Sequence, residues 1–176
     1  MSIENKSQRT FKKVLSLGVL GIFLLGMQSC AGEPESTEGT AMEVIPGTTF
    51  QHEGNLTFYY GDSLKTEIQI EIAETEGAIT QGLMHRRSMD FDGGMLFIFS
   101  DNVIRSFWMK NTIIPLDIIY VSEDMKIVSI KDHTTPYSTD PVPSDGKIAK
   151  YVIEVNSGFA GKYGLKEGDM ISFERL

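Results

Sequence analysis

The sequence predicts a mainly β protein, an antiparallel β-sandwich or barrel of about eight strands with two short helices. Two observations support this fold class. From Leu56 onward, short apolar or alternating runs follow one another along the chain. Most of these runs are separated by tight turns rather than by long helices, which favours antiparallel pairing over a parallel sheet of βαβ units.

The first two expected strands are residues 56–60 and residues 68–72. In the second run, isoleucines alternate with Gln69 and Glu71, the period of a strand with one buried and one solvated face. Residues 61–63, Gly-Asp-Ser, supply the turn between them. The chain is therefore expected to begin with a β-hairpin.

A short helix is expected next, from Thr75 to about residue 84. Thr75 can cap its N-terminus, and Glu76 suits the first turn of a helix. Gly77 and Gly82 weaken the helix. Residues 95–99, Met-Leu-Phe-Ile-Phe, then form a continuous apolar run that indicates a buried strand.

The remaining elements are punctuated by proline and glycine. Further strands are expected at residues 106–109, 116–121, 126–131, 148–155 and 170–174, with a break at Pro115. Residues 132–146 hold three prolines and are expected to form an irregular loop. A second short helix is expected from Ser157, as its cap, through Tyr163, with Gly164 ending it.

The N-terminal residues 1–29 have the layout of a secretory signal peptide. Four basic residues precede an apolar run, residues 14–27, that is short for a membrane span. Cys30, the only cysteine, follows directly, and the segment LLGMQSC resembles a bacterial lipoprotein signal, although Met27 and Gln28 depart from the usual pattern. We therefore expect a lipidated Cys30, a flexible linker over residues 30–54 and a single β-rich domain over residues 55–176. A free buried thiol is the alternative for Cys30.

Charge restricts the partners. Removing residues 1–29 changes the chain from 16 basic and 24 acidic groups to 12 and 23, a net charge of −11. Such a charge disfavours nucleic acid and anionic lipid as partners. The expected location is the cell envelope, facing the periplasm or the surface, with membrane attachment through the acyl chains of Cys30.

Seven ordered blocks carry a family resemblance. They are EIAET (71–75), GLMHR (82–86), GMLF (94–97), FWMKNT (107–112), PLDIIY (115–120), YVIEVN (151–156) and Gly-Asp (168–169). In this order they resemble the family catalogued as domain of unknown function 192, over about residues 65–176. The chain departs from the family's usual form at Gly77-Ala78.

The resemblance implies a β-sandwich of jelly-roll type with short helices, and it implies no established activity. The motif match carries over a set of polar positions: Arg86, Lys110, Asn111, Thr112, Asp117, Ser144, Glu154 and Asn156.

Four of the candidate site residues suit ligand binding. Arg86 can hold a carboxylate in two-pronged fashion or stack on Trp108, the only tryptophan. Lys110 and Asn111 would place a cation and an amide beside Trp108, the composition of a sugar- or peptide-binding surface. The alternatives are structural: an ion pair from Arg86 to Asp117 or Glu154, and turn formation at residues 110–112. The favoured function is a small-ligand or glycan-binding module.

Two further functions remain open. Asp117 and Glu154 are carboxylates inside apolar strands, so an envelope glycan-acting enzyme would need them in one cleft, about 5–9.5 Å apart. A purely structural or protein-interaction domain would need neither. No nucleophile, P-loop or dinucleotide motif occurs, so an enzyme is the less favoured class. The oligomeric state is left open.

No metal or cofactor is expected. The methionines and His85 are the residue types of a Cu(I) site, but no tight ligand spacing occurs, and methionine more often fills a core.

Overall fold

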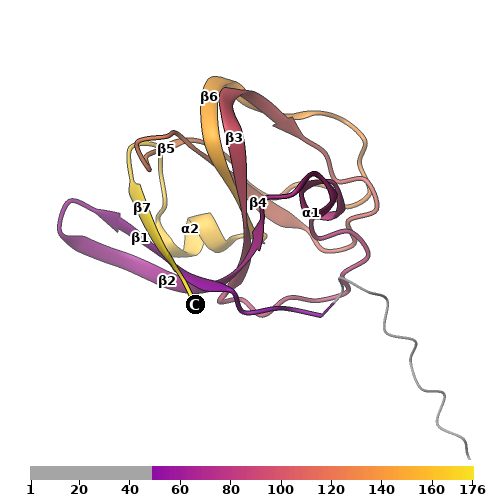
Figure 1. Cartoon of the computed structure of the whole chain (residues 1–176), viewed down its shortest axis with the longest axis horizontal. Coiled ribbons are helices and arrows are strands. Elements are labelled where there is room, and N and C mark those ends of the chain that lie inside the picture. The colour runs from indigo at the N-terminus through magenta and orange to yellow at the C-terminus, as the bar shows by residue number, and fades with distance from the viewer. Residues whose placement is uncertain (1–48) are drawn as a thin grey trace, which may run out of the picture. The chain divides into compact units, whose positions relative to one another are not determined.

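The computed structural model describes residues 49–176, and these residues form one mixed β-sheet with two short helices (Figure 1). The expected signal peptide, Cys30 and the linker as far as residue 48 lie outside the described residues. The elements in chain order are β1 (Gly54–Tyr60), β2 (Ser63–Ala73), α1 (Glu76–Gln81), β3 (Gly93–Phe107), β4 (Leu116–Val121), β5 (Ile127–Lys131), β6 (Val142–Asn156), α2 (Phe159–Tyr163) and β7 (Met170–Arg175). None of the helices in this part of the chain has the length and apolar character that a membrane crossing needs.

The sheet has the strand order β5-β4-β6-β3-β2-β1-β7. Every neighbouring pair is antiparallel except β2 and β3, which run parallel with Gln69 opposite Gly93. Between these two strands the chain passes through α1, which lets it return and start β3 in the direction of β2. A single bridge, Lys126 to Met170, links the region of β5 with the start of β7.

The mainly β class and the two short helices are confirmed, but three finer predictions were wrong. The sheet is mixed rather than wholly antiparallel, and it is one sheet rather than a sandwich or a closed barrel. Its strands number seven in the described residues, because β3 runs unbroken from Gly93 to Phe107, where two separate strands were expected at residues 95–99 and 106–109. The jelly-roll arrangement that the resemblance implied is not confirmed. The irregular loop is also shorter than expected, since β6 already begins at Val142.

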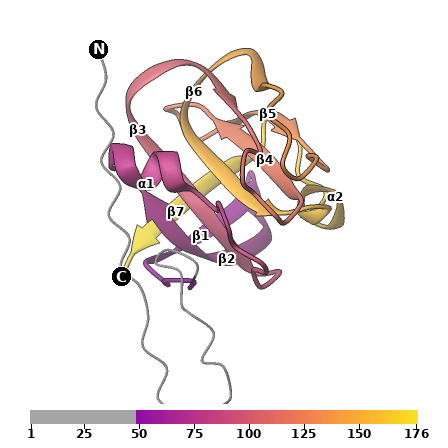
Figure 2. The same cartoon turned by 90° about the vertical axis from the view of Figure 1, so that its right-hand side faces the viewer.

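Two apolar clusters, one on each face of the sheet, hold the fold together. One contains Ile119, Ile153 and Phe159 and lies under α2, whereas the other contains Phe97, Ile118 and Val152 and is approached by α1. Because successive residues of a strand point to opposite faces, β4 and β6 contribute to both clusters. Figures 1 and 2 show α1 and α2 on opposite sides of the central strands.

The helix caps explain where the helices begin and end. Thr75 caps α1 as predicted, since its hydroxyl accepts a hydrogen bond from the Ala78 N–H. The helix ends at Gln81, earlier than predicted, because Gly82 adopts a φ of 46°. α2 starts after Gly158, whose φ is 84°, and not at the expected cap Ser157.

Candidate functional site

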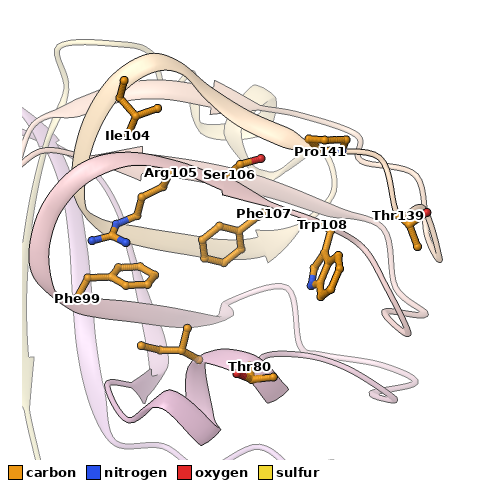
Figure 3. A pocket seen from close by; sticks show the side chains of 10 residues that line it. Thr80, Phe99, Ile104, Arg105, Ser106, Phe107, Trp108, Thr139 and Pro141 are labelled. Atoms are coloured by element: carbon orange, nitrogen blue, oxygen red, sulfur yellow. The ribbon is translucent and has the colours of Figure 1, made fainter.

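A hollow of about 550 Å³ lies between α1 and the outer part of β3 (Figure 3). We call it the α1–β3 groove. Its lining is mostly apolar and aromatic, with a few hydroxyl groups and one guanidinium: Ile79, Thr80, Phe99, Ile104, Arg105, Ser106, Phe107, Trp108, Thr139 and Pro141. Apolar walls with a few polar groups are the usual composition of small-ligand sites.

The groove exists because β3 is irregular in the middle. Its pairing with β6 shifts register between Ile98 and Val103 and again between Ile104 and Ser106. Such bulges bend a strand and redirect its side chains. The outer part of β3 and the segment with Thr139 thereby face α1 across the groove (Figure 3).

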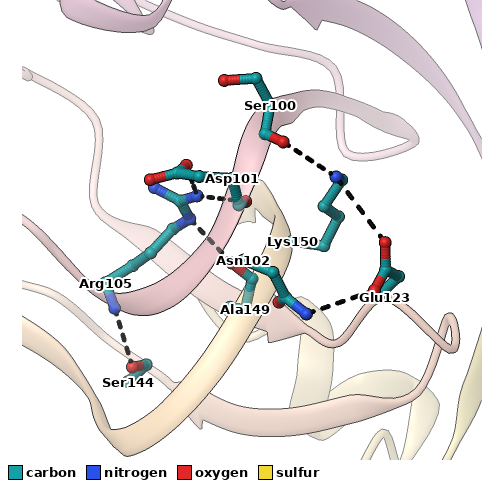
Figure 4. A network of polar contacts seen from close by, with 8 residues as sticks. All are labelled: Ser100, Asp101, Asn102, Arg105, Glu123, Ser144, Ala149 and Lys150. Atoms are coloured by element: carbon teal, nitrogen blue, oxygen red, sulfur yellow. Dashed lines mark hydrogen bonds and ion pairs between the residues drawn. The ribbon is translucent and has the colours of Figure 1, made fainter.

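A polar network fixes this bend (Figure 4). The Arg105 guanidinium donates to the Ala149 carbonyl at 2.8 Å and to both the carbonyl and the carboxylate of Asp101. Its Cζ also lies 3.5 Å from the centroid of the Phe99 ring. The Arg105 backbone N–H donates to the Ser144 hydroxyl at 3.2 Å. Arg105 therefore serves mainly to hold the groove wall, and its charge is already balanced by Asp101.

A second, smaller hollow of about 30 Å³ adjoins the groove, and we call it the inner chamber. It shares Ile79, Thr80, Phe107 and Trp108 with the groove. Its other lining residues come from the end of α1 and the turn after it, and from the sheet below: Gln81, Gly82, Leu83, Met84, Phe97, Thr112 and Glu154.

Among the residues that the structure describes, Glu154 is the one ionisable side chain that lines the inner chamber. It stands on β6 opposite Met95 of β3 and Ile118 of β4, and only 5% of its surface is exposed. No described residue hydrogen-bonds to its carboxyl group. Burial raises the pKa of this carboxyl group to about 8, so it carries a proton at neutral pH. Gly82 lies beside it, and a Cβ there would lie 3.3 Å from the Phe97 ring and 3.9 Å from the Glu154 Oε2.

Trp108, Lys110 and Asn111 lie together in the loop after β3. Trp108 is 48% exposed and borders both hollows. The Lys110 Nζ lies 5.1 Å from the centroid of its indole ring, and Lys110 itself is exposed. Asn111 has a φ of 58°, and its carbonyl accepts a hydrogen bond from the His85 N–H at 2.8 Å. Asn111 therefore forms a turn, while Trp108 is available to a ligand.

Arg86 lies away from both hollows. It is 2% exposed, and its two terminal nitrogens lie 2.6 and 3.1 Å from the Glu71 carboxylate oxygens on β2. Neither of the partners expected from the sequence, Asp117 or Glu154, is the partner in the structure. Sequence reasoning had placed Glu71 on a solvated face, whereas that face of β2 is covered by the loop that carries Arg86.

Asp117 is fully buried on the opposite face of the sheet from Glu154. It pairs with Val155, whereas Glu154 pairs with Ile118, one residue further along β4. Its carboxylate accepts three backbone hydrogen bonds, from the N–H groups of His133, Gly158 and Ala160. The two carboxylates that the enzyme alternative requires in one cleft are therefore separated by the sheet.

Of the residues that line the groove, only Trp108 was a candidate from the sequence, and those missed include Phe99, Phe107, Arg105, Ser106 and Thr80. An available signal was the density of phenylalanine around Trp108, which continues beyond the buried run at residues 95–99. Within residues 49–176, no cluster of three or more His, Cys, Asp or Glu side chains is arranged to hold a metal ion.

Comparison with known proteins gives a family and a fold. The family model described as "Uncharacterized ACR", domain of unknown function 192, matches residues 60–173. One similar solved structure is that of a protein of unknown function from Novosphingobium aromaticivorans, with 33% sequence identity and a TM-score of 0.63. The match covers 67% of this chain and 83% of that protein. Another is that of a putative transcription regulator from Sinorhizobium meliloti, with 30% sequence identity and a TM-score of 0.66. This match covers 69% of this chain and 93% of that protein.

No functionally curated protein matches the sequence. The match over residues 60–173, together with the two solved structures, shows that the chain belongs to the family of domain of unknown function 192.

Proposed function

We propose that the domain is a binding module that takes a small polar ligand or a segment of glycan into the α1–β3 groove. The observation that carries the proposal is the half-exposed Trp108 at the edge of a groove that also contains Phe99 and Phe107. Aromatic faces pack against the apolar face of a sugar ring, while hydroxyl groups such as those of Thr80 and Ser106 bind its polar edge.

Binding is favoured over glycan hydrolysis by the position of the carboxylates. Hydrolases of glycans use two carboxyl groups that flank one bond. Here Glu154 borders the inner chamber, while Asp117 lies on the other face with all its contacts made to backbone N–H groups. An enzyme using this pair would need a different sheet register.

A protein-contact module is the second candidate function. Ile104 and Ile148 pair with each other across β3 and β6, and they are 60% and 53% exposed. Exposed apolar side chains that lie together on a strand pair are a common feature of interaction surfaces. The Sinorhizobium protein's description as a putative transcription regulator has no support in the charge of this chain, which is −8.

We also propose that the protein is a lipoprotein of the cell envelope, anchored through Cys30 after removal of residues 1–29. The support is the order of basic residues, apolar run and lone cysteine at the N-terminus. Cys30→Ser should move the protein from the membrane fraction to the soluble fraction. Continued membrane partitioning of this variant would contradict the proposal.

Trp108 makes the groove directly testable, because it is the only tryptophan and its emission reports this site alone. Tetramers of N-acetylglucosamine and of glucose should be titrated against the protein. Binding in the groove predicts a saturable change in emission with a shift to shorter wavelength, as the indole ring leaves water.

The control uses two matched substitutions. Thr80→Arg fills the groove from α1, whereas Thr135→Arg makes the same change at an exposed threonine outside the groove. The first should abolish the response and the second should leave it intact. If neither sugar changes the emission, or if Thr80→Arg responds like the wild type, glycan binding in this groove is refuted.

A further inference from the structure

We propose that the inner chamber is an ammonium subsite, in which a ligand seated in the α1–β3 groove extends a primary amine past Trp108 to the carboxylate of Glu154. This inference rests on the groove being the ligand site proposed above, and it names the chemical class of that ligand. The class is a primary ammonium on a narrow stem, as in a diamine or a lysine side chain.

The dimensions of the chamber select a small head group. Its volume of about 30 Å³ is that of about one water-sized group. Phe107 and Trp108 border both the chamber and the groove, so a ligand bound against the aromatic wall has a short path inward. A sugar ring or an aromatic ring would not fit, whereas an ammonium group on an unbranched chain would.

The chamber wall has the chemistry of a cation site. Only 5% of the Glu154 surface is exposed, and its carboxyl group accepts no hydrogen bond from residues 49–176. A buried carboxylate without a partner is costly, so the empty site keeps this group protonated, and a ligand cation would stabilise the ionised form by pairing with it. Phe97, Phe107 and Trp108 add three aromatic rings, whose faces attract cations.

The end of α1 reinforces this preference. The chamber is lined by residues 79–84, which include the last turn of α1 and the residues after it. The C-terminus of a helix carries partial negative charge and favours a cation. α1 has no basic side chain in its last turn, so no residue of the helix supplies that cation.

The titratable and charged groups on the surrounding elements make contacts with residues other than Glu154. On β4, the Tyr120 hydroxyl donates a hydrogen bond to the Val142 carbonyl. On the loop after α1, Arg86 is held by Glu71 of β2. Glu76 is the only charged residue of α1 and is exposed in its first turn.

The basic residues Lys110 and Arg105, near the groove, make other contacts. Lys110 lies over the indole ring of Trp108 in an exposed position, and Arg105 pairs with Asp101. No ion pair to Glu154 is formed by any lysine or arginine of the described chain.

Amine binding is linked to the proton on Glu154. The pKa of this carboxyl group in the empty site is about 8, so an incoming ammonium group must displace its proton at neutral pH. The ionised fraction rises from about 1% at pH 6 to about half at pH 8, which predicts an increase of about 50-fold in affinity over this interval. A neutral group that accepts a hydrogen bond from the protonated acid would show the opposite trend.

The test compares two probes that carry a primary ammonium group with one that lacks it. Cadaverine and Nα-acetyl-lysine amide carry the ammonium group, and the Nε-acetylated form of the second probe lacks it. Binding is followed by Trp108 emission from pH 6 to pH 8, and calorimetry in two buffers of different ionisation enthalpy counts the protons released. The free diamine and the lysine derivative distinguish the two sources of this chemistry.

The expected result is binding of at least one amine probe, with release of nearly one proton at pH 7 and tighter binding at pH 8. The acetylated probe should bind at least tenfold more weakly. Glu154→Gln preserves the shape of the side chain and should remove both the proton release and the preference for amines. Glu167→Gln, a change at an exposed carboxylate outside the hollows, should remove neither.

Four results would overturn the inference. Equal binding of the acetylated probe, or an unchanged amine preference in Glu154→Gln, would show that Glu154 does not select an ammonium group. A response of Trp108 to the sugar tetramers but to neither amine would overturn the ammonium subsite and leave the groove as the ligand site. No response to any probe would overturn both.

Discussion

The buried Glu154 should make the protein lose stability as the pH rises, and Glu154→Gln should abolish that loss. In the folded protein, burial raises the pKa of Glu154 from 4.5 to about 8. Between these values the folded state holds a proton that the unfolded state has released, so the free energy of unfolding falls with increasing pH. The stabilising effect of the proton is complete below pH 4.5 and is lost as the pH rises through about 8.

The size of the effect follows from the same two pKa values. In this interval each pH unit lowers the free energy of unfolding by about 1.4 kcal/mol, because the folded state binds one more proton than the unfolded state. From pH 5 to pH 8 the stability of Glu154→Gln relative to the wild type should therefore grow by about 3.5 kcal/mol. Glutamine has nearly the same shape and no charge, so the packing around the inner chamber is conserved.

Urea unfolding at fixed pH values, followed by far-ultraviolet circular dichroism, measures this difference. Other titrating groups cancel when the variant is subtracted from the wild type. Glu167→Gln is the control, and its curve should run parallel to the wild-type curve because Glu167 is exposed. Parallel curves for Glu154→Gln and the wild type would refute the assignment of a buried, protonated carboxyl group.

The other predictions concern the fold and are measured by urea unfolding. Asp117→Asn should destabilise the protein by about 3 kcal/mol, because one amide oxygen cannot serve three buried N–H donors; a loss below about 1 kcal/mol would contradict this. Arg86→Met should cost about 3–5 kcal/mol by leaving Glu71 unpaired, and adding Glu71→Leu should restore most of the loss. Failure of the double variant to recover would argue against a structural pair. Gly94→Ala should cost about 1–3 kcal/mol, since its Cβ would lie 2.9–3.1 Å from three atoms of β2 and β6. Gly77→Ala on α1 meets nothing within 4 Å and should instead stabilise by up to about 1 kcal/mol, and the opposite order of these two glycine variants would refute the packing described.

Local sequence signals predicted the elements but not the way in which they assemble. Alternation identified β1 and β2, Pro115 marked the break before β4, and Thr75 capped α1. These features depend on residues near in sequence. The parallel pairing of β2 with β3 depends instead on the path of the chain through α1 and residues 82–92, which no local pattern records.

The same limit applies to the bend of β3. Polar residues 100–102, Ser-Asp-Asn, lie between the runs at residues 95–99 and 106–109, which were expected to form two strands. In the structure Arg105 binds the Ala149 carbonyl and Asp101, so the polar residues brace a continuous bent strand. The groove is a product of that bend, which is why Trp108 was found from the sequence and the rest of its wall was not.

Asp117 and Glu154 show how a single step in register places two similar carboxyl groups in different surroundings. Both are carboxylates in apolar strands, and the sequence gives them the same appearance. Because Asp117 is paired with Val155 and Glu154 with Ile118, the two side chains leave the sheet on opposite faces.

On the face that carries α2, the Asp117 carboxylate accepts hydrogen bonds from three backbone N–H groups. On the other face, α1 stops at Gly82 above Glu154, and no described donor comes within hydrogen-bonding distance. The hydrogen bonds of Asp117 tie the backbone at residues 133, 158 and 160 to β4. Glu154 receives no hydrogen bond from the described residues and lies beside an aromatic groove, and the pH dependence of the stability difference between the wild type and Glu154→Gln measures how far burial raises its pKa.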